Sequence, residues 1–117
     1  MSAAPMPTPT PRLSACVITR NEADRIDACL VSLAFCDELV VVDSHSTDAT
    51  REIAARHGAH VIERDWPGYR SQKQFATDAA GSDWVLSIDA DERVTPALRA
   101  EIEALRASGF AGACGWC

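Results

Sequence analysis

The sequence lacks the features that mark the commonest nucleotide-binding and membrane proteins. It has no G-x-G-x-x-G after its first apolar run and no G-x-x-x-x-G-K-[ST] anywhere, so no glycine-rich loop can cradle phosphates, which excludes most dehydrogenases and kinases. No apolar run reaches the roughly 18 residues needed to cross a bilayer. The formal net charge is -6 and no block of Lys and Arg could follow a phosphate backbone. Nucleic acid is therefore not an expected partner.

The cysteines do not form a disulfide framework. They are odd in number and scattered over presumptive strand, helix and tail: Cys16, Cys29, Cys36, Cys114 and Cys117. The C-x-x-C pair at the end has no second pair that would complete a zinc site. This pattern fits a reducing compartment, so we expect a cytoplasmic protein, with peripheral contact at the inner face of the membrane left open.

The two ends of the chain differ in composition from its centre. Residues 1–12 are rich in Pro, Thr and Ala and lack the basic start and apolar stretch of a secretory signal, so we expect a mobile tail. Residues 108–117 are expected to form an irregular C-terminal tail. Residues 13–107 between them are predicted to fold as one domain, because the chain of 117 residues has the 47 % apolar and 24 % charged composition of a globular protein.

Strand and helix patterns alternate four times within this domain. Short apolar or β-branched runs predict strands at 13–19, 38–43, 59–63 and 84–88. Apolar residues at helical spacing predict helices at 22–34, 49–57 and 69–80, and Thr95-Pro96 opens a last helix that carries Leu98, Ile102 and Leu105. This alternation is typical of an α/β fold with a parallel sheet, whose ligands bind beyond the carboxyl ends of the strands.

Polar clusters follow three of the predicted strands, at 19–22, 43–48 and 89–92. Asp89 and Asp91 are separated by one residue, so in extended backbone both carboxylates face one space. Mg²⁺ or Mn²⁺ takes one or two such carboxylates and leaves other positions to substrate phosphates. The sequence therefore predicts a metal site at Asp89 and Asp91. Asp43, at the end of the second strand, is a candidate for a hydrogen bond to a ribose hydroxyl.

Other polar and aromatic residues nearby receive no catalytic role. Glu92 is expected to be a capping or solvated residue before Pro96, and no residue is nominated as general base. Trp66 and Tyr69 stand beside a Pro-Gly turn. Stacking of these rings on a base or sugar is one alternative, but we expect them to pack against the edge of the core.

Four motifs in order carry a resemblance to a known family. They are I-T-R-N-E at 18–22, V-V-D-S-H-S-T-D-A-T at 41–50, W-P-G-Y-R-S-Q-K-Q-F-A at 66–76 and S-I-D-A-D-E at 87–92. Together they resemble the family two glycosyltransferases, most closely the branch that builds the lipopolysaccharide core. The resemblance runs from Leu13 to about Leu105.

The resemblance implies a GT-A fold, a Rossmann-like three-layer sandwich with a mostly parallel sheet. It also implies a nucleotide-diphosphate sugar as donor, with a UDP-sugar favoured, and transfer with inversion to a hydroxyl of a glycan or lipid-linked saccharide. The residues that match the family's motifs take the following roles: Thr19, Asn21 and Glu22 line the nucleotide pocket, Asp43 contacts the base or ribose, Lys73 meets the nucleotide, Asp89 contacts the ribose, and Asp91 binds the metal.

The sequence departs from the family's pattern in two places. Gln74 stands where Asn usually follows the basic residue. The family's second half, which brings the acceptor site and the general base, has no counterpart in these residues, so a chain cut short before that half is one expectation. A non-catalytic nucleotide-sugar-binding module is an alternative. A nucleotidyltransferase is disfavoured because that class normally carries a glycine-rich, basic loop after its first strand, where this chain has Arg20-Asn21-Glu22.

Overall fold

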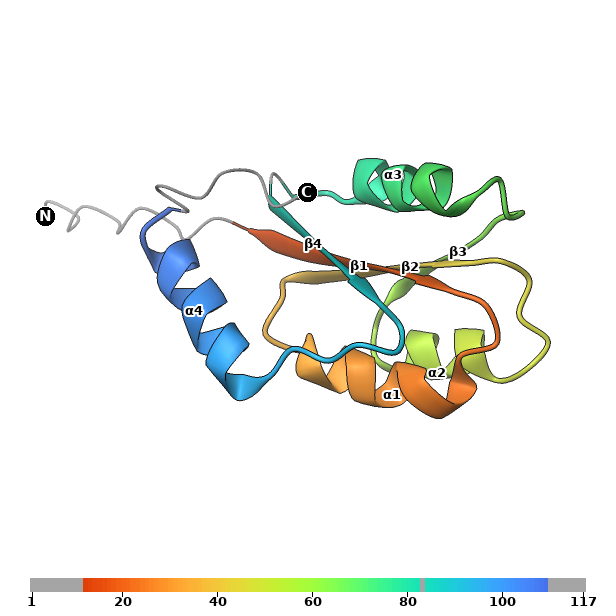
Figure 1. Ribbon diagram of the computed structural model, residues 1–117, viewed down its shortest axis with the longest axis horizontal. Helices are drawn as coiled ribbons and strands as arrows, with labels where there is room; N and C mark the ends of the chain where they lie inside the picture. The colour runs from red at the N-terminus through yellow and green to blue at the C-terminus, as the bar shows by residue number, and fades with distance from the viewer. Residues whose placement is uncertain (1–11, 83, 110–117) are drawn as a thin grey trace, which may run out of the picture.

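The computed structural model describes residues 12–82 and 84–109, in which strand and helix alternate four times (Figure 1). The strands are β1 (Leu13–Thr19), β2 (Glu38–Asp43), β3 (His60–Glu63) and β4 (Trp84–Asp89). The helices are α1 (Ala23–Ser32), α2 (Thr50–Arg56), α3 (Tyr69–Ala79) and α4 (Pro96–Ala107). The expected N-terminal tail up to residue 11, most of the expected C-terminal tail and the pair Cys114 and Cys117 lie outside the described residues.

The strands form one parallel sheet in the order β3-β2-β1-β4. Thr19 at the end of β1 is level with Asp43 of β2, and Ile18 is level with Asp89 of β4. The carboxyl ends of three strands therefore meet at one edge. The predicted α/β class with a parallel sheet is confirmed.

Helices cover both faces of the sheet, as Figure 1 shows, with α1, α2 and α4 on one side and α3 on the other. In the first core, Val17 and Val41 of the sheet pack with Ile26 and Leu30 of α1. A second, smaller core packs strand residues against Ala76 of α3; these are Cys16, Val40 and Val42. Since alternate residues of β2 face opposite cores, its continuous apolar run is buried on both sides. The three-layer sandwich is confirmed.

Local signals place the ends of several elements. Thr95 accepts a hydrogen bond from the Leu98 N–H at 3.1 Å, and Pro96 occupies the first turn of α4. Gly58 follows α2 with φ 78°, a conformation that a residue with a Cβ avoids. Cys16 is buried as expected, and burial raises the pKa of its thiol to about 12.

The observed bounds differ from the expected ones by one or two residues. The helix expected at 22–34 spans Ala23–Ser32, and the one expected at 49–57 spans Thr50–Arg56, because the flanking residues serve as caps and turns. Strand β4 is longer than expected and includes Asp89. None of the helices in the described ranges is long and apolar enough to cross a membrane.

Candidate functional site

The ends of β1 and β2 form a buried hydrogen-bond network centred on Asp43. The Asp43 side chain is fully buried, and its Oδ1 accepts from Thr19 Oγ1 at 2.7 Å and from Ser46 Oγ at 2.5 Å. Its Oδ2 accepts the Ser46 N–H at 2.8 Å, with Arg51 Nε at 3.7 Å. Thr19, which is 4 % exposed, is therefore engaged by Asp43 in this structure. Two of the predicted site residues contact each other and fix the ends of their strands.

Asn21 and Glu22 join the β1–α1 loop to the β2–α2 loop. Asn21 is in the left-handed region with φ 53°, and its Oδ1 accepts the Thr47 N–H at 2.8 Å. The Asn21 N–H donates to Ser46 Oγ at 2.8 Å, and the Glu22 N–H donates to Thr50 Oγ1 at 2.9 Å. The predicted pocket residues thus belong to two loops that hydrogen bonds join, and Asn21 is exposed at the surface.

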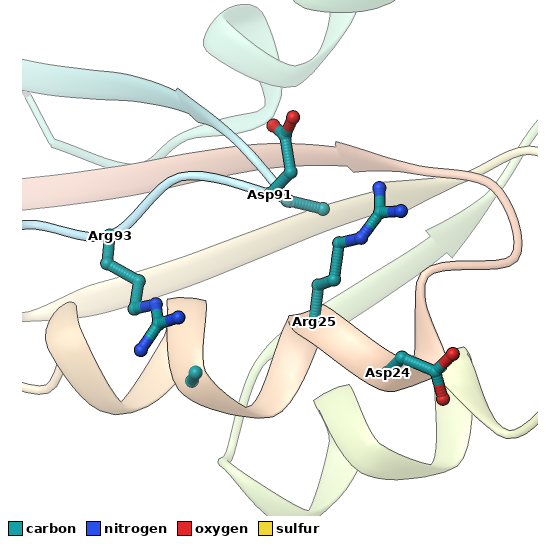
Figure 2. A pocket seen from close by; sticks show the side chains of 6 residues that line it. Asp24, Arg25, Asp91 and Arg93 are labelled. Carbon is teal, nitrogen blue, oxygen red and sulfur yellow. The ribbon is translucent and has the colours of Figure 1, made fainter.

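An open depression of about 460 Å³ lies between α1 and the turn that follows β4 (Figure 2). Its lining residues are Asp24, Arg25, Ala28, Ala90, Asp91 and Arg93. The predicted metal ligand Asp91 therefore borders a hollow that two arginines also line. Asp43 lies apart from this hollow, within the buried network.

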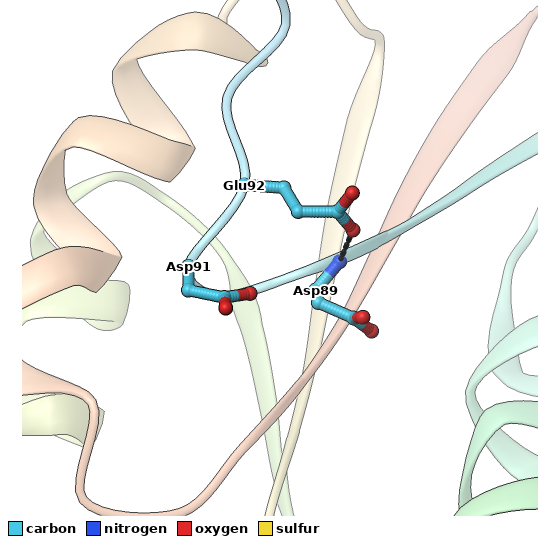
Figure 3. A group of neighbouring side chains, drawn as sticks. All are labelled: Asp89, Asp91 and Glu92. Carbon is cyan, nitrogen blue, oxygen red and sulfur yellow. Dashed lines mark hydrogen bonds between the residues drawn. The ribbon is translucent and has the colours of Figure 1, made fainter.

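The same turn gathers three carboxylates, Asp89, Asp91 and Glu92 (Figure 3), each of which offers an oxygen within 4.8 Å of the others. Glu92 bends back so that its Oε1 accepts the Asp89 N–H at 2.9 Å, which fixes the turn. Carboxylate oxygens are the ligands that Mg²⁺ and Mn²⁺ prefer. The residues present thus fit a hard divalent cation, and they include both predicted ligands. Glu92 therefore fixes the turn and joins the cluster, whereas the residue that caps α4 is Thr95.

Two residues of α3 hold the Asp89 carboxylate from the other side. The Tyr69 hydroxyl lies 2.7 and 2.9 Å from its two oxygens and donates to it, while Lys73 Nζ is 3.2 Å from Oδ1 and 4.7 Å from the centre of the Tyr69 ring. Partial burial opposes charge on Lys73, but its hydrogen bonds with Tyr69 and Asp89 outweigh burial and raise its pKa. The structure therefore brings the predicted Lys73 and Asp89 together.

The expectation that Trp66 and Tyr69 pack against the core is wrong. Their side chains are 46 % and 51 % exposed and meet edge to face at 6.3 Å between ring centroids. The Pro-Gly turn projects both rings outward, and the hydroxyl of Tyr69 reaches Asp89. Tyr69 and Lys73 are four residues apart and so share one face of α3, a spacing that could have linked Tyr69 to the site.

A parallel α/β sheet with a carboxylate cluster at its carboxyl edge can bind a phosphate-bearing ligand through a cation. Residues 14–117 match the sequence profile of Glycosyl transferase family 2. The chain belongs to that family, and the resemblance drawn from the four motifs is confirmed.

Relatives in two bacterial groups illustrate the match. An uncharacterized glycosyltransferase of Rickettsia bellii is 47 % identical over 100 residues, which are 85 % of this chain and 34 % of the relative. The lipopolysaccharide core biosynthesis glycosyltransferase LpsC of Rhizobium meliloti is 40 % identical over 92 residues, 74 % of this chain and 34 % of that protein. The chain thus spans about a third of the length of these curated relatives.

Solved structures show the same GT-A fold. Glucosyl-3-phosphoglycerate synthase from Mycobacterium tuberculosis, in complex with Mn²⁺, UDP and glucosyl-3-phosphoglycerate, superposes with a TM-score of 0.62 at 26 % identity. The superposition covers 71 % of this chain and 36 % of the synthase. Another structure of that synthase holds Mg²⁺ and UDP.

Proposed function

We propose that this chain binds the nucleotide-diphosphate sugar of a family two glycosyltransferase, through a divalent cation held by Asp89 and Asp91. The observation that carries the proposal is the gathering of three carboxylates at the carboxyl edge of the sheet, in a chain of this family. Mg²⁺ or Mn²⁺ is the proposed cofactor and a UDP-sugar the favoured donor, since the similar synthase binds both cations with UDP.

Asp89 and Asp91 would hold the cation, which would supply positive charge to the diphosphate leaving group as the glycosidic bond breaks. Glu92 fixes the turn through the Asp89 N–H, and Tyr69 and Lys73 contact the Asp89 carboxylate, so a ligand at Asp89 has to compete with them. Lys73 is the residue proposed to meet the nucleotide, because its ammonium is partly exposed at this edge.

The nucleotide-pocket roles of Thr19, Asn21, Glu22 and Asp43 remain proposals, and the geometry attaches a condition to one of them. Both oxygens of Asp43 already accept hydrogen bonds from Ser46. For Asp43 to contact a base or ribose, the β2–α2 loop must therefore move, or the ligand must replace the hydrogen bonds of Ser46. Asn21 is exposed, so it can meet a ligand without such a change.

Transfer with inversion to a hydroxyl of a glycan or lipid-linked saccharide is the reaction proposed for the whole protein. The similarity to a lipopolysaccharide core biosynthesis glycosyltransferase supports this acceptor class. Residues 13–107 are proposed as the donor-binding domain. We propose a cytoplasmic location, at the inner face of the membrane where the acceptor is lipid-linked.

Calorimetry with UDP, GDP and dTDP, each with and without Mn²⁺, tests the donor site. We expect one nucleotide to bind only with the cation, and Asp91→Asn to weaken that binding at least about tenfold. Glu101→Gln on the exposed side of α4 removes the same charge at a distance and should change nothing. If no nucleotide binds with Mn²⁺ or Mg²⁺, the proposal is wrong.

Turnover separates a transferase from a module that only binds. Release of free nucleotide from a UDP-sugar in the presence of an oligosaccharide or lipid-linked acceptor would establish transfer. Binding without release under the same conditions would support the non-catalytic alternative. Pyrophosphate formed from a sugar phosphate and a nucleoside triphosphate would instead favour a nucleotidyltransferase.

A further inference from the structure

The depression beside Asp91 is lined by two arginines that the donor-binding proposal does not use. Arg25 comes from α1 and Arg93 from the turn before α4, and both are exposed. In Figure 2 the Arg25 side chain extends from α1 toward the turn that bears Asp91, and Arg93 extends from that turn toward α1. Two guanidinium groups thus flank one hollow in a chain whose net charge is -6.

Arg25 and Arg93 make few polar contacts within the described part of the chain. Arg25 has one ion pair, at 3.4 Å to Glu22, and its side chain is 63 % exposed. Arg93 has no hydrogen bond or ion pair with any residue in 12–82 or 84–109. By contrast, Arg51 pairs with both Asp43 and Glu63, and Arg99 pairs with Glu103 and lies over Phe35. The donors of Arg25 and Arg93 are therefore available to a ligand.

The charge of the lining depends on the state of Asp91. Two arginines and two aspartates balance when Asp91 is a free carboxylate. A divalent cation on Asp91 adds two positive charges beside Arg25 and Arg93, which the neighbouring carboxylates Asp89 and Glu92 offset in part. A planar guanidinium matches the oxygens of a phosphate or carboxylate, so the lining then suits an oxyanion.

We propose that this depression binds a phosphate or carboxylate group of a substrate through Arg25 and Arg93, in concert with a cation on Asp91. The inference rests on the proposed function for its cation and adds a second anion subsite to it. The anionic group belongs either to the donor's diphosphate or to the acceptor. Coupling between two ligands is reciprocal, so the anion and the cation must strengthen each other's binding by the same factor.

The test is the affinity of the chain for Mn²⁺, measured by electron paramagnetic resonance of the free ion, with and without inorganic phosphate. A protein-free titration corrects for the complex of Mn²⁺ with phosphate. We expect phosphate to tighten Mn²⁺ binding at least about fivefold in the wild-type chain. In Arg93→Gln and Arg25→Gln this gain should be lost or greatly reduced, while Mn²⁺ alone binds as tightly as before or tighter, because a nearby positive charge has been removed.

Arg56→Gln is the matched control, since it removes an exposed arginine from the last turn of α2 and should keep the full gain. No gain in the wild-type chain, or an equal gain in Arg93→Gln, would overturn the inference. Repeating the titration with saturating UDP identifies the source of the anion: loss of the phosphate effect assigns the subsite to the donor's diphosphate, and persistence assigns it to the acceptor.

The two proposals fail in different ways. Nucleotide that binds with Mn²⁺ while phosphate shows no coupling contradicts this inference and leaves the donor site standing. Phosphate that couples to Mn²⁺ while no nucleotide binds contradicts the donor site and leaves a metal-dependent anion site.

Discussion

Asp43 and Asp91 stand at the same edge of the sheet and have opposite surroundings. Asp43 ends β2, is fully buried and accepts hydrogen bonds from Thr19 and Ser46. Asp91 follows β4, is exposed and borders an open depression. Hydrogen-bond donors of Thr19 and Ser46 bind the Asp43 carboxylate. The oxygens of Asp91 are open to a ligand. The difference shows that position at a strand end does not by itself decide whether an acid stabilises the fold or binds a ligand.

Asp89 is intermediate between these two cases. It belongs to β4 and is held by Tyr69 and Lys73, but its side chain is 36 % exposed and its oxygens lie in the carboxylate cluster. The fold therefore orients Asp89 without burying it. A ligand at Asp89 must compete with hydrogen bonds already made, while one at Asp91 competes mainly with water.

Removing Asp43 should have the largest effect on stability. Asp43→Ala leaves the buried hydroxyls of Thr19 and Ser46 without their acceptor, so we expect a loss of about 2–4 kcal/mol in the free energy of unfolding. Urea denaturation followed by circular dichroism measures it. Asp91→Ala is the control and should stay within about 0.5 kcal/mol of wild type. Equal losses in the two variants would contradict the contrast between the two acids.

Adding and removing the metal should have the next largest effect. Mn²⁺ at about 100 times its dissociation constant is expected to raise the free energy of unfolding by about 2.7 kcal/mol, because the ion binds only the folded chain. A chelator should reverse the gain. The gain should be largely absent in Asp91→Asn and complete in Glu101→Gln. If Mn²⁺ stabilised Asp91→Asn as much as wild type, the ion would bind at another site.

Tyr69→Phe tests whether the hydrogen bond from Tyr69 competes with a metal ion for the Asp89 carboxylate. The variant removes a hydroxyl that occupies the Asp89 oxygens, so we expect Mn²⁺ to bind about two to five times more tightly, the range of an exposed charged interaction. The free energy of unfolding should change little, because the Tyr69 ring is half exposed. Weaker Mn²⁺ binding would show instead that Tyr69 prepares Asp89 for the ion.

The smallest effect concerns pH and the loop that follows Asp43. His45 lies in that loop, with Nδ1 at 3.0 Å from Glu63 and Nε2 at 2.5 Å from Asp65, and these hydrogen bonds raise its pKa above the usual 6.5. A raised pKa in the folded state contributes stability below pH 6.5 that is lost as the pH rises through the raised value.

The urea midpoint of His45→Gln should therefore fall below that of wild type in acid and converge with it in alkali. His60→Gln, which changes an exposed histidine of β3 outside this loop, is the matched control for the loss of an imidazole. A constant difference between His45→Gln and wild type would mean that the charge of His45 has no part in holding the loop.

Much of this architecture was predictable because local patterns repeat along the chain. The run at β2 predicted a doubly buried strand, Thr95-Pro96 predicted the start of α4, and D-A-D predicted two carboxylates that share one space. Each of these signals lies within a few residues and depends on backbone geometry alone.

Other features depended on residues far apart in the chain. The hydrogen bond of Thr19 to Asp43 spans 24 residues and follows from the register of β1 with β2. The exposure of Trp66 and Tyr69 followed from the path of the chain from β3 across to α3, which a sequence pattern does not specify. The arginines beside Asp91 line one hollow only because α1 meets the end of β4, where the Cys29 thiol donates to the Asp89 carbonyl at 3.7 Å.

The sequence by itself determined the alternation of strand and helix, the parallel sheet and the family, since all three follow from periodicity and from short motifs in order. The tertiary structure decided which acids are buried and which are open. A carboxylate becomes structural only where strand register and loop packing bring donors to it and exclude water, and here that happened at Asp43 and not at Asp91.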